Sequence, residues 1–258
     1  MFTLDCDRAY LYAHPERELT PDEMRRYNDA LARRSTGVPA QYITGHQEFW
    51  GLDFIVSPAV LIPRPETEHV VEAVLELAKP DGRGRPSPHG RRIVDVGTGS
   101  GAIALALATE LPSAEIYATD ISPEALEVAR ANAARLELTS RVEFHLADLL
   151  GGFPPDSFDI VVSNPPYVGA SEEGSVQLEV RKFEPRNAVF AGPTGVEVIE
   201  RLIPQARETL RPGGWLVFEI SGTIAEAARR QLAGWTDVGL TNDLQGIARV
   251  ASARKPPQ

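Results

Sequence analysis

The residues best suited to chemistry form one short motif, Asn164-Pro165-Pro166-Tyr167. It follows an apolar run over residues 158–163, which predicts a buried strand that ends in a turn. Two consecutive prolines lack N–H donors and hold the backbone extended, so peptide carbonyls there have fewer local partners. Carbonyl and amide oxygens can accept N–H bonds from a small planar group while an aromatic ring covers its face. The motif therefore predicts a site for such a group, and a proline-rich turn without a ligand is the alternative.

A glycine-rich turn follows an earlier expected strand. Gly97-Thr98-Gly99-Ser100-Gly101 lies between a strand over residues 92–96 and a helix over 100–110. Glycine lets the backbone turn sharply and pass close to a ligand. Taken alone, the turn could also bind a dinucleotide, whose pyrophosphate would lie at the helix N-terminus. It could equally be a tight turn that binds no ligand.

Two further strand ends carry carboxylates. Asp120 ends a strand over residues 115–120 and can accept both hydroxyls of a ribose. Asp148 follows a strand over 142–147, where its carboxylate can accept an adenine amino hydrogen while Leu149 packs on the ring. A solvent-facing strand end is the alternative for each aspartate. In an open α/β sheet these strand ends converge with Asn164 at the edge where ligands bind.

The elements that must position these residues alternate along the chain. Strands are expected over residues 92–96, 115–120, 142–147, 158–163, 214–220, 236–242 and 247–253. Helices are expected over 100–110, 123–136, 195–210 and 223–233. This order predicts βαβ units, and so an α/β fold with a seven-stranded, mainly parallel sheet covered by helices on both faces.

The N-terminal part has a different character. Residues 8–12 predict one helix, and a capping box with Thr20 as N-cap and Glu23 three residues later begins another. Residues 40–62 have strand character, with a hairpin whose strands 48–50 and 53–56 flank Gly51-Leu52. A helix is expected from Thr67 to Lys79, and an exposed loop over 80–92. The expected divisions are a helical segment (1–39), a hairpin connector (40–62) and a catalytic domain (63–258).

Composition excludes several classes of function. The 258 residues carry a net charge of −10, which argues against a broad electrostatic grip on nucleic acid. A single cysteine, Cys6, excludes an internal disulfide framework and fits a reducing compartment. The five histidines lack paired metal-ligand spacing, so no metal site is expected. No apolar run approaches about 18 residues and no signal-like N-terminus is present, so we expect a cytoplasmic protein without membrane contact.

The ordered strand ends resemble those of the class I S-adenosylmethionine-dependent methyltransferases, in which Asn-Pro-Pro-Tyr marks enzymes that methylate amino and amide nitrogens. Further blocks narrow the resemblance to the protein-(glutamine-N5) methyltransferases of the HemK/PrmC type, which modify peptide chain release factors. They occur in family order over nearly the whole chain: QYITG (41–45), EFWG (48–51), LIPRPETE (61–68), DVGTGSG (95–101), SNPPYV (163–168), FEPRNAV (183–189) and LRPGG (210–214).

The resemblance implies a Rossmann-like fold and a reaction. A methyl group would pass from S-adenosylmethionine, leaving S-adenosylhomocysteine, to N5 of the glutamine in the Gly-Gly-Gln motif of release factors. Release factors are the expected partners, without stable nucleic acid binding. The implied substrate-binding residues are those of the 164–167 motif, and Pro63, Arg64 and Glu66 are placed near the cofactor. The implied cofactor-binding residues are Gly97, Thr98, Gly99, Ser100, Gly101, Asp120, Ile121, Asp148, Leu149 and Asn164.

The motif suggests how a poor nucleophile could react, because an amide nitrogen delocalises its lone pair. Our hypothesis is that the Asn164 side-chain oxygen and the Pro165 carbonyl each accept one substrate N–H. This would align the nitrogen with the methyl–sulfur bond and favour its developing positive charge. Tyr167 would stack on the amide and place π density near the methyl group. No general base is required, because the methylated amide is acidic enough to lose its proton to water.

Two features depart from the family pattern. The N-terminal helical segment is shorter than in most members, and AGPTGV (191–196) replaces a pattern that more often reads Gly-Gly-x-Asp-Gly-Leu.

Three alternative functions stay open. An amino methyltransferase acting on adenine or guanine must flip a base and grip a polyanion, which the acidic balance disfavours. A nicotinamide-dependent dehydrogenase would suit Asp120 but not the Pro-Pro-Tyr element, and a non-catalytic binding protein could retain the fold.

Overall fold

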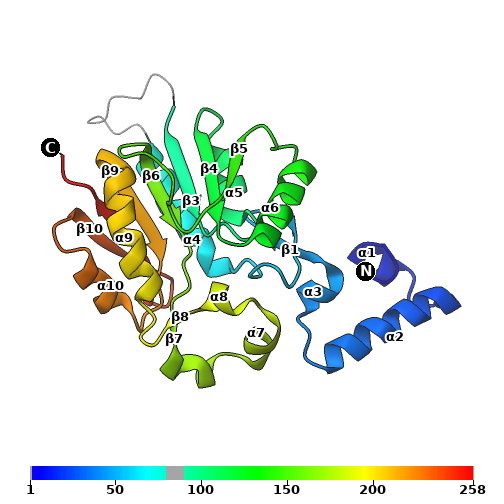
Figure 1. Ribbon diagram of the computed structural model, residues 1–258. Helices are drawn as coiled ribbons and strands as arrows, with labels where there is room; N and C mark the ends of the chain where they lie inside the picture. The colour runs from blue at the N-terminus through cyan, green and yellow to red at the C-terminus, as the bar shows by residue number, and fades with distance from the viewer. Residues whose placement is uncertain (1, 80–89, 258) are drawn as a thin grey trace.

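A seven-stranded sheet forms the centre of the molecule (Figure 1). The computed structural model describes residues 2–79 and 90–257, so most of the loop expected over 80–92 lies outside the described residues. The strand order is β10-β11-β9-β6-β3-β4-β5. Strand β11 runs antiparallel to the other six, which are parallel to one another. The expected α/β fold with a mainly parallel sheet is confirmed. The strands are β3 (Arg92–Val96), β4 (Glu115–Asp120), β5 (Val142–Leu146), β6 (Phe158–Ser163), β9 (Leu210–Glu219), β10 (Thr236–Asn242) and β11 (Ala248–Arg254).

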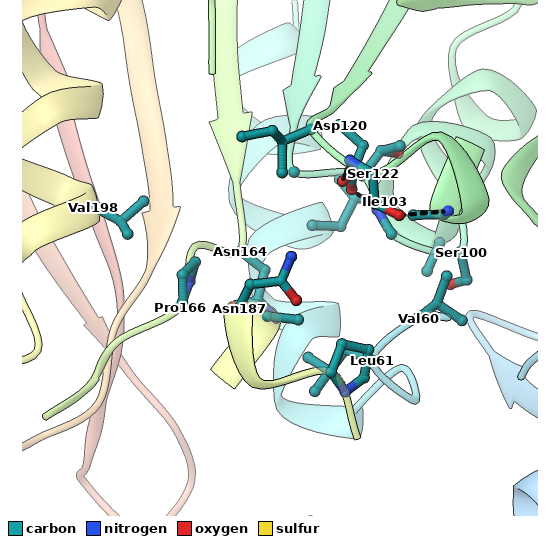
Figure 2. Close-up of a pocket in the computed structure, with 18 of the residues that line it drawn as sticks. Val60, Leu61, Ser100, Ile103, Asp120, Ser122, Asn164, Pro166, Asn187 and Val198 are labelled. Atoms are coloured by element: carbon teal, nitrogen blue, oxygen red, sulfur yellow. Dashed lines mark hydrogen bonds between the residues drawn. The ribbon is translucent and has the colours of Figure 1, made fainter. Parts of the chain in front are cut away.

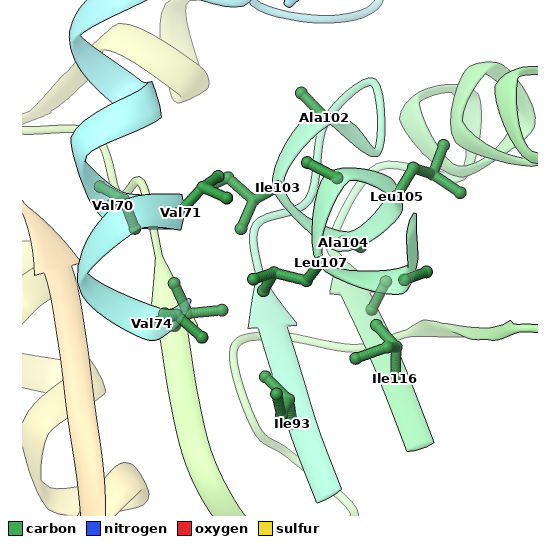
Figure 3. Packing of buried hydrophobic residues seen from close by; sticks show 14 of the residues in the cluster. Val70, Val71, Val74, Ile93, Ala102, Ile103, Ala104, Leu105, Leu107 and Ile116 are labelled. Carbon is green, nitrogen blue, oxygen red and sulfur yellow. The ribbon is translucent and has the colours of Figure 1, made fainter. Parts of the chain in front are cut away.

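Helices cover both faces of the sheet, as expected. On one face pack α4 (Glu68–Ala78), α5 (Ala102–Glu110) and α6 (Pro123–Arg135), and on the other α9 (Glu197–Thr209) and α10 (Ala225–Gln231). Successive strand residues point to opposite faces, so Ile93 packs with the first layer and Val94 with the second. Figure 3 shows Val71 of α4 and Ile103 of α5 pointing toward each other in the first layer. Both faces of the strands are thus apolar, as parallel sheets require.

Two helix starts differ from expectation because of glycine. The helix expected from residue 100 begins at Ala102, and the one expected from 195 begins at Glu197. Gly101 and Gly195 have φ values of +84° and +89°, which lie outside the helical region. The strand expected from 214 begins four residues earlier, at Leu210 of β9, which pairs with Phe158 of β6.

The N-terminal helices are present. They are α1 (Arg8–Ala13) and α2 (Pro21–Ser35), and Figure 1 shows both well apart from the sheet. The capping box forms as predicted, since Glu23 N–H donates to Thr20 Oγ1 at 3.3 Å and Thr20 N–H donates to Glu23 Oε2 at 2.8 Å. In the described part of the chain, no helix combines the length and hydrophobicity needed to cross a membrane.

The prediction of strand character over 40–62 was partly wrong. Residues Ala40–Thr44 form a helix, α3, whose Tyr42 is buried and donates its hydroxyl to the Val60 carbonyl at 2.6 Å. The hairpin strands are β1 (His46–Phe49) and β2 (Leu52–Ile55), and the turn is Trp50-Gly51 rather than Gly51-Leu52. Both turn residues have positive φ, +55° and +70°, as a two-residue hairpin turn of this hand requires.

Short elements over residues 65–67 and 168–192 were not predicted. A single 3₁₀ turn, η1 (Pro65–Thr67), precedes α4, which begins and ends one residue inside the expected helix. A small two-stranded sheet lies near the carboxyl end of β6, with helical turns between its strands. Its elements are β7 (Val168–Gly169), η2 (Ala170–Ser175), α7 (Leu178–Phe183), α8 (Arg186–Val189) and β8 (Phe190–Gly192).

Candidate active site

One cavity of about 320 Å³ opens at the carboxyl ends of β3, β4 and β6. This is the edge at which ligands bind in open α/β sheets, and the volume suits a small molecule. In the view of Figure 2, Asn164 and Pro166 lie on one side of the cavity and Asp120, Ser122 and Ser100 on the other. The topology therefore brings strand ends that are far apart in sequence to one site.

Nine of the ten residues expected to bind a cofactor line this cavity, together with Pro166 of the motif. The tenth, Gly101, does not line the cavity. A Cβ at this position would lie 3.1 Å from the Leu105 side chain and 3.3 Å from the Ala129 side chain. Pro165 is buried, and Tyr167 is half-buried and packs on the second core layer. The lining residues from the expected set are Gly97, Thr98, Gly99, Ser100, Asp120, Ile121, Asp148, Leu149 and Asn164.

The glycine-rich turn takes its shape from backbone hydrogen bonds to β4. The N–H groups of Gly97 and Thr98 both donate to the Thr119 carbonyl, at 2.9 and 2.8 Å. Gly97 and Gly99 have φ values of +71° and +55°, and a Cβ at either position would meet nothing within 4 Å. Their conformation, rather than crowding, therefore favours glycine, and it exposes bare backbone to the cavity.

Asp120 is held by backbone donors on both of its oxygens. Oδ2 accepts from Gly99 N–H at 2.9 Å and Oδ1 accepts from Ser122 N–H at 2.9 Å. Burial raises the pKa of Asp120, and the bonds from Ser122 and Gly99 oppose this rise. Each oxygen of an ionised carboxylate retains acceptor capacity after one such bond, so the side chain can still accept hydroxyl groups of a ligand.

Asp148 has a partner that sequence reasoning missed. Arg201 of α9 forms an ion pair with its carboxylate, and both side chains line the cavity. Each is about half exposed, at 54% for Arg201 and 52% for Asp148, so solvent screens the pair. No local pattern links residue 201 to 148, since the contact depends on how α9 packs over the sheet.

Asp95 is a buried carboxyl directly beneath the glycine-rich turn. It is 1% exposed, and its Oδ2 accepts from Thr98 Oγ1 at 2.6 Å and from Ala104 N–H at 3.2 Å. Burial raises the pKa of Asp95 to about 7, against the opposing effect of the two hydrogen bonds. The carboxyl therefore fixes the turn to the start of α5 and titrates near neutrality.

The two polar side chains of the 164–167 motif each bond a buried residue. Asn164 Nδ2 donates to Thr67 Oγ1 at 3.1 Å, and the Tyr167 hydroxyl donates to Glu219 Oε1 at 3.0 Å. Burial raises the pKa of Tyr167 above its usual range, and the Glu219 carboxylate adds to the rise. Sequence reasoning missed Thr67 and Glu219 as site residues. The signal for Glu219 is a lone carboxylate at the end of an apolar strand, Trp215-Leu216-Val217-Phe218.

The three residues placed near the cofactor by resemblance have different positions. Pro63 lines the cavity. Arg64 Nη2 donates to Glu184 Oε1 at 2.5 Å, so its side chain joins the start of η1 to the segment before α8. Glu66 lies close enough to Glu219 for its charge to raise that residue's pKa.

The unusual segment 191–196 is closed by the first residue of α9. The Glu197 carboxylate accepts from Thr194 N–H at 2.6 Å, Thr194 Oγ1 at 2.8 Å and Gly195 N–H at 2.9 Å. Gly195 also passes so close to the motif that a Cβ there would lie 2.6 Å from the Tyr167 carbonyl oxygen. Although its sequence departs from the family pattern, segment 191–196 is ordered, forms the start of α9 and packs next to the 164–167 motif.

Comparisons with known proteins identify methyltransferases as relatives of this chain. The family model described as "Methyltransferase small domain" matches residues 83–181, and the "PrmC N-terminal domain" matches residues 1–45. A release factor glutamine methyltransferase of Koribacter versatilis is 56% identical over 99% of this chain and 89% of its own length. Another, from Rhodopirellula baltica, is 39% identical over 97% and 85%.

A solved methyltransferase structure from Pyrococcus furiosus has the same fold. It covers 92% of this chain and 100% of its own, with a TM-score of 0.57 at 20% identity. The identities of 56% and 39% over most of the length of the two bacterial relatives show the family. The chain belongs to the release factor glutamine methyltransferases.

Proposed function

We propose that this protein transfers a methyl group from S-adenosylmethionine to N5 of the glutamine in the Gly-Gly-Gln motif of peptide chain release factors. The observation that carries the proposal is the position of Asn164, whose side chain lines the same cavity as the glycine-rich turn and Asp120. Membership of the family supports the choice of acceptor. The cytoplasm is the proposed location, because release factors act there.

The residues of the cavity fit a cofactor of this class. Gly97 and Gly99 present bare backbone, and the Asp120 carboxylate retains acceptor capacity for ribose hydroxyls. Ile121 is 59% exposed although apolar, as expected of a side chain that a planar base would cover. When bound, S-adenosylmethionine supplies an electrophilic methyl group on a sulfonium sulfur.

The residues of the motif would hold the acceptor amide. Asn164 Oδ1 and the Pro165 carbonyl would each accept one N–H bond from the glutamine side chain, which fixes the nitrogen and favours positive charge on it. Tyr167 would cover the amide from the side of the second core layer. Its hydroxyl stays on Glu219, so the ring rather than the hydroxyl would face the acceptor.

A methyl-transfer assay tests the proposal. Purified protein would be incubated with methyl-labelled S-adenosylmethionine and a release factor, and the modified residue located by mass spectrometry. We expect label on the Gly-Gly-Gln glutamine and none on a factor in which that glutamine is replaced. Label on DNA or RNA instead would favour the amino methyltransferase alternative, and binding of NAD in place of S-adenosylmethionine would favour a dehydrogenase.

A further inference from the structure

A buried hydroxyl holds the side chain of Asn164. Thr67 is 4% exposed, and its Oγ1 accepts from Asn164 Nδ2 at 3.1 Å. Thr67 ends the 3₁₀ turn η1 directly before α4, and it lines the same cavity as Asn164.

The two ends of the Asn164 amide differ in their hydrogen bonding. Nδ2 only donates and Oδ1 only accepts, whereas the lone pairs of a hydroxyl can accept. Thr67 Oγ1 accepts from Nδ2, and within residues 2–79 and 90–257 this is the one hydrogen bond to the Asn164 side chain. Held through Nδ2, Asn164 presents Oδ1 on its opposite side.

We propose that Thr67 is a positioning residue that holds the Asn164 amide with Oδ1 toward the acceptor. The inference rests on the proposed function, because it assigns the orientation of the group that binds the acceptor N–H. Thr67 does not act on the reacting atoms. By accepting from Nδ2 it sets the rotation of the amide.

Matched variants of Thr67 separate hydrogen bonding from packing. Thr67→Val keeps the shape and removes the hydroxyl, whereas Thr67→Ser keeps the hydroxyl and loses a methyl group. With S-adenosylmethionine and a release factor as substrates, we expect Thr67→Val to lower kcat about tenfold, the equivalent of one ordinary hydrogen bond. The KM for S-adenosylmethionine should stay unchanged, and Thr67→Ser should keep kcat near the wild-type value. Equal losses in the two variants, or no loss in Thr67→Val, would overturn the inference.

A measurement without a release factor distinguishes failure of this inference from failure of the proposed function. The side-chain ¹⁵N–¹H signals of Asn164, assigned by comparison with Asn164→Ala, should shift in Thr67→Val but not in Thr67→Ser. Signals that stay at the wild-type positions in Thr67→Val would refute the positioning role, whatever the acceptor. Shifted signals in a protein that does not methylate release factors would refute the proposed function alone.

Discussion

Arg64 and Glu184 join two segments that lie 120 residues apart in the sequence, at 2.5 Å between Nη2 and Oε1. The Glu184 side chain is 1% exposed, and its other oxygen accepts from Ile62 N–H at 3.3 Å. The neighbouring residues Pro63 and Pro185 both line the cavity. The ion pair therefore holds two walls of the site together.

Removal of Arg64 should destabilise the protein. Arg64→Ala leaves a buried carboxylate without its charged partner, and we expect a loss of about 2 kcal/mol in the free energy of unfolding. Denaturant titration would measure it. Arg186→Ala is the matched control, because its pair with Glu173 is exposed and should contribute little. Similar losses in both variants would show that the Arg64 pair has no special role.

Removal of Asn164 should affect turnover more than cofactor binding. Asn164→Ala takes away the proposed acceptor for the substrate amide, and we expect kcat to fall by about two to three orders of magnitude, as for loss of one preorganised polar group. Affinity for S-adenosylmethionine, measured by calorimetry, should change less. Asn242→Ala, at an exposed position on β10, is the control. Near-normal glutamine methylation by Asn164→Ala would refute the assigned role.

Asp120 should contribute more to cofactor affinity than Asp148. Asp120 is held by two backbone donors and Asp148 is paired with Arg201 at the half-exposed rim. We expect Asp120→Asn to weaken binding of S-adenosylmethionine about tenfold to a hundredfold, because hydrogen bonds to a charged group are lost. Asp148→Asn should weaken it by less. Calorimetric titration of both variants gives the comparison, and the reverse order would contradict it.

Asp95 should make stability depend on pH. Its pKa is about 7 in the folded protein, whereas the ordinary value for an aspartate side chain, which applies to the unfolded chain, is 3.8. Between these values the folded state binds more protons than the unfolded state, so its stabilising contribution is present in acid and is lost as pH rises to about 7. Asp95→Asn lacks this titration. Its stability relative to wild type should therefore increase between pH 5 and pH 8, by at most about 1.4 kcal/mol per pH unit. Thermal melts at each pH would show it, and a constant difference would contradict it.

Local sequence patterns predicted most strands and helices of the central sheet. Most of its strands are short apolar runs bounded by turn residues. Its helices have either one apolar face or, as in α5, apolar residues along the whole helix, so their positions follow from the local sequence. The glycine-rich turn, Asp120 and Asn164 could be assigned to one edge because parallel strands place their carboxyl ends together.

Contacts between distant segments could not be predicted in this way. The β7–β8 pair has strands of two and three residues, too short for any periodicity. Thr67, Glu219 and Arg201 contact residues of the site from η1, β9 and α9, which lie dozens of residues from their partners in the sequence. The turn residue Trp50 is likewise held by distant partners, since its N–H donates to Glu68 and its indole to Glu110, both at 2.9 Å.

The bonds from Gly97 and Thr98 to the Thr119 carbonyl link ligand binding to the folding of the sheet. Thr119 belongs to β4, so the turn acquires its shape only when β3 and β4 have paired. An opening motion that separates these strands would abolish the site, and a bound cofactor would oppose that motion by RT ln(1 + [L]/Kd). A bound cofactor would therefore stabilise the pairing of β3 with β4, and slower amide exchange across these strands in its presence is the property that would reveal it.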